Sequence, residues 1–234
     1  MSAVVGVVAF PGTNCEHDVV QAVEALGGRA RVLWHGGTSL GGVDAVVLPG
    51  GFAHGDYLRP GALARFAPIM AAVADLADAG GPVVGICNGF QVLTEAGLLP
   101  GALHRNRDLT FLCATVQVRV DATTSVLTGE AVPGQVLSVP INHFEGRYVC
   151  DADTLAALRA EGRVVLRYVH NPNGSVDDIA GVANRAGNVV GVMPHPERAS
   201  LPLLGSTDGA VLLGSLLAAA GSPRSSLPHP VGRR

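Results

Sequence analysis

Residues 80–97 read GGPVVGICNGFQVLTEAG, and this stretch decides the fold because it joins a strand pattern directly to a helix pattern. Val83–Ile86 is a short apolar run, as expected of a strand covered on both faces in a parallel sheet. From Asn88 the residues favour a helix through Leu93. Cys87 stands at the corner between the two elements, where a core would need only another valine.

The first half of the chain repeats this alternation of strand and helix. Apolar runs at 3–10, 29–35 and 43–51 predict further strands, and helical patterns occupy 15–28 and the region near 60–79. Strands and helices of these lengths predict βαβ units. The expected fold class is therefore α/β: a flavodoxin-like, doubly wound, mostly parallel central sheet with helices on both faces.

The second half is richer in strand patterns. The runs at 111–120, 134–143 and 162–170 predict antiparallel strands added to the sheet, and 178–197 reads as a hairpin with its turn at 184–188. Residues 1–220 are expected to form one domain, and the Pro- and Ser-rich stretch 221–234 is expected to be disordered.

The composition limits the functions to consider. Of the 234 residues 48% are hydrophobic and 15% charged, and the net charge is −3 with scattered basic residues, so neither nucleic acid nor a membrane is an expected partner. No leader peptide or membrane span is predicted. The four cysteines occur singly and are expected to be reduced thiols, which points to the cytoplasm.

Cys87 is a candidate nucleophile. A strand that turns sharply into a helix exposes the corner side chain above the sheet, and Gly85 and Gly89 leave room for the tight backbone. A helix N-terminus also favours a thiolate. The alternative for Cys87 taken alone is an inert buried cysteine.

His195 and Glu197 are candidate partners of that thiol. They lie after an apolar strand, and Pro194 and Pro196 favour an extended backbone, in which residues two apart project to the same side. Glu197 can then orient His195 as the base in a Cys–His–Glu relay. A surface histidine and a solvated carboxylate are the alternatives.

A glycine-rich loop supplies the third part. The sequence PGGFAHGDYLRPG at 49–61 follows a predicted strand, and glycines there can present bare N–H groups to an oxyanion. The N–H groups of Gly51 and Asn88 are the expected oxyanion donors. A phosphate-binding loop is the competing interpretation, but both common phosphate-loop patterns are absent.

Four motifs carry a resemblance: GICNGFQ (85–91), PGGFAHGDYLRPGA (49–62), NPNGSVDDIAG (171–181) and GNVVGVMPHPERA (187–199). They resemble the class I, triad-type glutamine amidotransferases, and within them the glutaminase subunits of phosphoribosylformylglycinamidine synthase. The likeness extends from about Val4 to Leu217. It implies Cys87 as nucleophile, His195 as base and Glu197 as its orienting group.

The resemblance also implies a substrate pocket. Gln91, one helical turn after Cys87, is an expected contact to glutamine, although a helix-surface role is an equal alternative. Asn142, His143 and Phe144 are further expected contacts, and a structural role is the alternative for His143. The sequence INHFEG departs from the family pattern AHGEG at Asn142 and Phe144, and His54 departs from it in the glycine-rich loop.

The implied function is hydrolysis of L-glutamine to supply ammonia. The resemblance implies a separate synthetase subunit, which uses ATP and Mg²⁺ to convert formylglycinamide ribonucleotide to formylglycinamidine ribonucleotide in purine synthesis, and a small bridging subunit. No cofactor and no metal are expected in this chain. The alternatives are a stand-alone cysteine hydrolase or peptidase on a similar fold, and a non-catalytic regulatory subunit.

Overall fold

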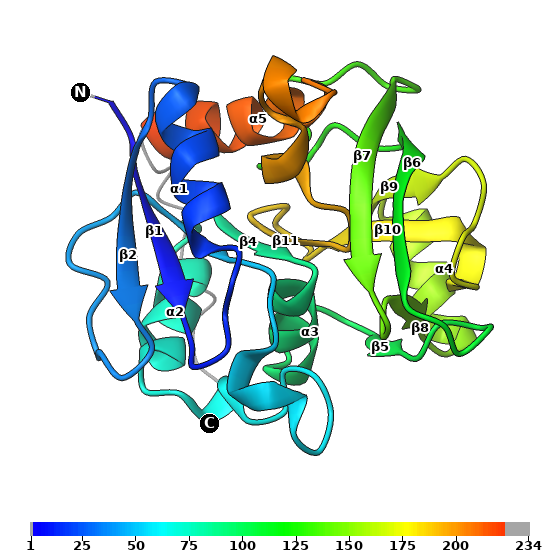
Figure 1. Cartoon of the computed structure of the whole chain (residues 1–234), viewed down its shortest axis with the longest axis horizontal. Coiled ribbons are helices and arrows are strands. Elements are labelled where there is room, and N and C mark those ends of the chain that lie inside the picture. The colour runs from blue at the N-terminus through cyan, green and yellow to red at the C-terminus, as the bar shows by residue number, and fades with distance from the viewer. Residues whose placement is uncertain (1, 223–234) are drawn as a thin grey trace.

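The computed structural model describes residues 2–222, which build a mixed sheet with helices packed against it (Figure 1). The α-helices are α1 (Glu16–Ala25), α2 (Ile69–Asp78), α3 (Asn88–Glu95), α4 (Ala152–Ala160) and α5 (Gly209–Gly221). The strands are β1 (Val4–Ala9), β2 (Arg29–Trp34), β3 (Ala45–Leu48), β4 (Val83–Ile86), β5 (Ala102–His104), β6 (Leu112–Val120), β7 (Val136–His143), β8 (Arg147–Val149), β9 (Val164–Tyr168), β10 (Ile179–Ala183) and β11 (Val189–Val192).

The main sheet has the strand order β2-β1-β3-β4-β11-β10-β9-β6-β7. Neighbours from β2 to β11 are parallel, whereas those from β11 to β7 are antiparallel. The predicted fold class is confirmed, including the antiparallel strands of the second half. The predicted hairpin is formed by β10 and β11, and β11 also pairs in parallel with β4, so it joins the two halves.

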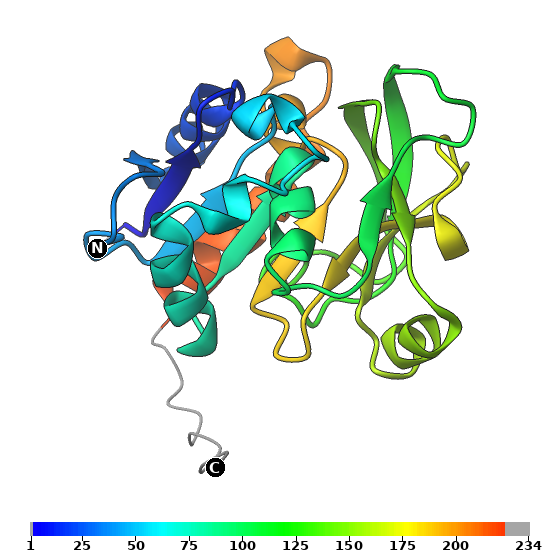
Figure 2. The same cartoon turned by 90° about the horizontal axis from the view of Figure 1, so that it is seen from below.

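Burial explains the continuous apolar runs. Every residue of β3, β4 and β11 is buried, which requires cover on both faces of the sheet. Helices α1 and α5 contact each other and β1, while α2 and α3 contact β4. In Figure 2, α4 lies beside the antiparallel strands, away from α1.

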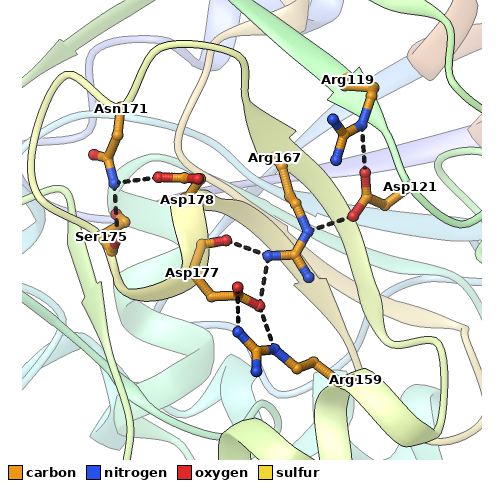
Figure 3. Close-up of polar contacts among 8 residues, drawn as sticks. All are labelled: Arg119, Asp121, Arg159, Arg167, Asn171, Ser175, Asp177 and Asp178. Carbon is orange, nitrogen blue, oxygen red and sulfur yellow. Dashed lines mark hydrogen bonds and ion pairs between the residues drawn. The ribbon is translucent and has the colours of Figure 1, made fainter.

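The antiparallel half carries a network of charged side chains (Figure 3). The carboxylate of Asp177 forms ion pairs with Nη2 of Arg159 and with Nη1 of Arg167, each at 2.5 Å. Arg167 also forms an ion pair with Asp121. Asp177 and Asp178 both have φ near +55°, an unusual conformation for a residue other than glycine. The network therefore fixes a strained turn, the short 3₁₀ segment Val176–Asp178, against α4 and β9.

The topology brings three chain segments to one edge of the sheet. Strands β3, β4 and β11 are adjacent and parallel, so their carboxyl ends lie together. They lead into the glycine-rich loop, into α3 through Cys87, and through His195 into the short 3₁₀ helix η4 (Pro196–Ala199). This edge therefore holds the three motifs that the sequence singled out.

Two boundaries differ from expectation. The helix expected near 60–79 begins only at Ile69, after a 3₁₀ turn at Ala64–Phe66. Helix α5 extends to Gly221, one residue into the predicted tail, and residues 223–234 of that tail lie outside the described residues. Within residues 2–222, no helix has the length and apolar character needed to cross a membrane.

Candidate active site

Cys87 occupies a strained corner between β4 and α3. Its φ is +50° and its ψ is −104°, and its N–H donates to the carbonyl oxygen of Val192 at 2.8 Å. A Cβ added to Gly89 would lie 1.8 Å from the carbonyl oxygen of Leu48, and one on Gly85 would lie 2.6 Å from the Gly89 carbonyl group. The expected sharp turn is present, and both glycines are needed for its close packing.

His195 and Glu197 form a buried pair. Nδ1 of His195 lies 2.6 Å from Oε1 of Glu197, and each residue is 2% exposed. The N–H of His195 donates to the carbonyl oxygen of Pro140 at 2.8 Å, which ties the base to β7. Burial opposes protonation, but Glu197 and Cys87 outweigh it and hold the pKa of His195 well above its usual value. Glu197 and Cys87 thus favour the protonated form of the imidazole.

Cys87 and His195 line the same small cavity, of about 60 Å³. Sγ of Cys87 lies 3.7 Å from the carbonyl oxygen of Asn142 at the end of β7. Nε2 of His195 is buried and has no hydrogen-bond partner within residues 2–222. The thiol and the imidazole thus border one cavity, Glu197 contacts the other side of the ring, and the ring nitrogen opposite Glu197 is available for proton transfer.

Two backbone N–H groups lie near this cavity: Gly51 lines it, and Asn88 directly follows Cys87, which also lines it. Gly51 has φ +143°, and the N–H groups of Gly51 and Asn88 donate no hydrogen bond within the described part of the chain. Both belong to corners that follow strand ends. Their position suits the oxyanion role that the sequence predicts.

The side chain of Asn88 fixes the wall of the cavity. Its Oδ1 accepts from the N–H of Ala53, and its Nδ2 donates to Asp56 at 3.1 Å and to Gln91 at 2.9 Å. Nε2 of Gln91 donates to the carbonyl oxygen of Glu145 at 2.6 Å. Gln91 lines the cavity as expected, but both ends of its amide bind protein groups, so in this state it braces two loops.

Asn142, His143 and Phe144 also line the cavity, as expected. Nδ2 of Asn106 donates to two carbonyl oxygens, so its Oδ1 accepts from Nδ1 of His143 at 3.1 Å. Burial and the charge of His195 lower the pKa of His143 to about 4. His143 is therefore neutral, and its buried Nε2 is a hydrogen-bond acceptor without a partner among residues 2–222.

Six cavity residues were not anticipated: Asn14, Cys15, Phe52, Asp56, Glu145 and Arg198. Cys15 opens α1 as expected, but nothing in its local spacing indicated that it lies beside His195. The pKa of Asp56 is raised to about 6, chiefly by burial, with a further contribution from Glu145. The motif GGFAHGD contained this signal, since a carboxylate, which is costly to bury, follows its glycines.

Comparison with known proteins shows the family of the chain. The CobB/CobQ-like glutamine amidotransferase domain matches residues 2–207. PurQ subunits of phosphoribosylformylglycinamidine synthase are 58% identical over 216 residues in Rubrobacter xylanophilus and 55% identical over 214 residues in Synechococcus elongatus. The first alignment covers 92% of this chain and 98% of the relative, and the second covers 91% and 97%.

Two solved structures resemble this chain in fold. A chain in the structure of PurLQS from Thermotoga maritima superposes with a TM-score of 0.86 at 41% identity, covering 93% of this chain and 99% of that one. A putative GMP synthase subunit from Thermoplasma acidophilum shares the fold, with a TM-score of 0.66 at 15% identity and 94% coverage of both chains.

The fold and the site define a glutamine amidotransferase of the triad type. Within that class, the chain belongs to the family of PurQ subunits of phosphoribosylformylglycinamidine synthase. A stand-alone peptidase and a non-catalytic subunit are not favoured, because the family is a different one and the thiol, imidazole and carboxylate are all present.

Proposed function

We propose that this chain hydrolyses L-glutamine through a Cys87 thioester and supplies the ammonia for conversion of formylglycinamide ribonucleotide to formylglycinamidine ribonucleotide. The observation that carries this proposal is the strained Cys87 corner at the same cavity as the buried His195–Glu197 pair. The family membership gives the reaction its acceptor and its place in purine synthesis.

The catalytic steps follow from the geometry. The Cys87 sulfur attacks the side-chain amide carbon of glutamine, and the resulting oxyanion accepts from the N–H groups of Gly51 and Asn88. The cationic His195 gives a proton to the departing ammonia, and Glu197 stabilises the imidazolium and fixes its orientation. Water then attacks the thioester with His195 as base, releasing glutamate and restoring the thiol.

His143 is proposed to bind the substrate. Its neutral ring offers a buried acceptor nitrogen in the cavity, so it suits an N–H donor of glutamine rather than a carboxylate. Asn142 and Phe144 complete the same wall, and Gln91 is proposed to exchange one of its protein contacts for a contact to glutamine.

A synthetase subunit is the proposed partner. Exposed apolar side chains gather on the glycine-rich loop and the 3₁₀ turn that follows it, where Tyr57, Leu58 and Phe66 are 74%, 86% and 73% exposed. Because this loop also carries Gly51 and Asp56, a partner bound there would act directly on the cavity. ATP and Mg²⁺ are assigned to that synthetase, a small third subunit is proposed to bridge the two, and the complex is placed in the cytoplasm.

Reconstitution with the synthetase and the small subunit tests the proposal. Cys87→Ala should abolish amination driven by glutamine and preserve amination driven by ammonium chloride, whereas Cys113→Ala, at an exposed thiol, should preserve both. Glutamine should also protect Cys87 from alkylation by iodoacetamide. Glutamine-driven amination by the Cys87→Ala complex at the wild-type rate would overturn the assignment.

A further inference from the structure

A second thiol, that of Cys15, lies beside the base. Cys15 is 2% exposed and borders the same cavity as Cys87. Its Sγ, a ring nitrogen of His195 and a carboxylate oxygen of Glu197 all lie within 4.8 Å of one another. The catalytic pair therefore has a sulfur neighbour that the reaction steps above do not use.

Gly50 shows which edge of the imidazole this sulfur approaches. A Cβ built on Gly50 would lie 2.7 Å from Cε1 and 3.5 Å from Nδ1 of His195, and 3.1 Å from Sγ of Cys15. The carbonyl oxygen of Gly50 accepts from the N–H of Cys15 at 3.3 Å. Cys15 and Gly50 thus pack together at the Nδ1–Cε1 edge of the ring, the edge that Glu197 also contacts.

Arg198 holds the sulfur in place. Its Nη2 donates to Sγ of Cys15 at 3.1 Å, its Nε donates to Oδ2 of Asp18 at 3.0 Å, and its N–H donates to the carbonyl oxygen of His195 at 3.2 Å. Sγ of Cys15 in turn donates to Oδ1 of Asn14 at 3.1 Å. Arg198 therefore connects the start of α1 to η4, the segment that carries the catalytic carboxylate.

We propose that Cys15 and Arg198 are positioning residues for the catalytic base, forming a clamp that fixes the imidazole ring of His195 against Glu197. This inference rests on the proposed function. The sulfur fills the space at the ring edge, and the guanidinium places a positive charge near the buried carboxylate of Glu197. Catalytic groups need placement within about 0.5 Å, so a cavity at this edge allows unproductive ring orientations.

A metal site is the rival interpretation of the same atoms. A thiol, an imidazole and a carboxylate are a suitable donor set for Zn²⁺. One contact argues against it, because the positively charged guanidinium of Arg198 lies 3.1 Å from the sulfur. A cation bound to the sulfur would have to displace this guanidinium.

The test uses the assembled complex carrying Cys15→Ala, Cys15→Ser or Arg198→Lys, with Cys113→Ala as the matched thiol control. Cys15→Ala should lower kcat with glutamine by about 10- to 100-fold with little change in KM, and leave the ammonium-driven rate unchanged. Cys15→Ser should recover part of the loss, because a hydroxyl still accepts from Arg198. The kcat of Arg198→Lys should lie between the values for Cys15→Ala and Cys15→Ser. A lysine ammonium lacks the planar guanidinium that reaches both Cys15 and Asp18.

The pH profile separates positioning from a purely structural role. The groups facing His195 are Glu197 and Arg198 of η4, Cys87 at the β4–α3 corner, His143 at the end of β7, and Cys15 before α1. The contact to Cys15 raises the pKa of His195. In Cys15→Ala, the limb of the kcat profile that reports His195 should therefore move to lower pH.

Three results would overturn the clamp. The first is a kcat and a pH profile for Cys15→Ala that equal those of the wild type. The second is a loss of the ammonium-driven rate as large as the loss of the glutamine-driven rate, which would mark misassembly of the complex. The third result has two parts: Zn²⁺ inhibits the wild type but not Cys15→Ala, and without metal the two have the same kcat. Together these would identify a metal site. None of these affects the proposed function, which fails only if the Cys87→Ala complex still uses glutamine.

Discussion

Nδ1 of His195 and Oε1 of Glu197 lie 2.6 Å apart, and both residues are buried. A buried carboxylate is costly unless a charged partner and hydrogen bonds compensate it. Here His195 provides a hydrogen-bond partner for Oε1, and the charge of Glu197 raises the pKa of His195 against the opposing effect of burial. The pair is therefore one electrostatic unit, in which a change to either residue affects the other.

The first prediction concerns that unit. Glu197→Gln should lower kcat for glutamine-driven amination by about 10⁴-fold, because an amide neither stabilises the imidazolium nor selects the required tautomer. Steady-state kinetics of the assembled complex measures the effect. Ammonium-driven amination serves as the control and should stay unchanged; a kcat within about tenfold of wild type would show that Glu197 does not orient the base.

The second prediction concerns the backbone of the nucleophile corner. Gly89→Ala places a methyl group 1.8 Å from the carbonyl oxygen of Leu48, so the free energy of unfolding should fall by about 3 kcal/mol or more. Gly214→Ala, in α5 with open space around it, should raise the free energy of unfolding by about 0.5–1 kcal/mol. Urea unfolding measures both, and equal effects of the two substitutions would contradict the packing argument.

The third prediction concerns the network of Figure 3. Hydrogen bonds from Arg159 and Arg167 lower the pKa of Asp177 to about 2, against some opposition from burial. The folded-state pKa lies below the unfolded value, so this carboxylate stabilises the fold above about pH 4 and loses that contribution as the pH falls towards 2. Asp177→Asn should therefore be less stable than wild type at about pH 7, with a difference that shrinks between about pH 4 and 2.

Asp178→Asn is the matched control, because Asp178 has the same positive φ and contacts Asn171 instead of an arginine. Asparagine tolerates that backbone conformation, so the comparison isolates the charge. Urea midpoints across the pH range give the result. A deficit of Asp177→Asn that is the same at about pH 7 and pH 2.5 would exclude the electrostatic origin.

The fourth prediction concerns Asp56, whose pKa is shifted in the opposite direction to that of Asp177. Burial, with Glu145 adding to it, raises the pKa of Asp56 to about 6, above its unfolded value near 4. The folded state therefore binds this proton more tightly, and the contribution of Asp56 to stability decreases as the pH rises from about 4 through 6. Asp56→Asn should gain stability relative to wild type over that interval, measured by urea unfolding from about pH 4 to 7.5, and a flat difference would refute the shift.

Sequence patterns predicted the parts of this molecule that local rules control. The apolar run before Cys87, its flanking glycines and the prolines around His195 each determine backbone geometry within a few residues. The parallel strands then bring these corners to one edge of the sheet by topology alone. That is why the sequence could predict that Cys87 and His195 lie at the same edge of the sheet.

What the sequence missed depends on contacts between distant segments. Cys15 reads as the first residue of a helix, and its approach to His195 follows from the packing of α1 on η4. The tautomer of His143 depends on Asn106, which lies far from it in sequence. The antiparallel hairpin was predicted, but the parallel pairing of β11 with β4 is a tertiary property. Such choices are fixed by burial and complementary polar groups, which one chain segment does not reveal.

The place of β11 in the sheet also governs when the enzyme acquires its chemistry. During synthesis, Cys87 leaves the ribosome long before β11 and His195, and β4 keeps an unpaired edge until β11 arrives beside it. A nascent or truncated chain that ends before β11 thus carries Cys87 without His195, the proposed proton donor. Late insertion of one central strand makes the reaction a property of the finished molecule only.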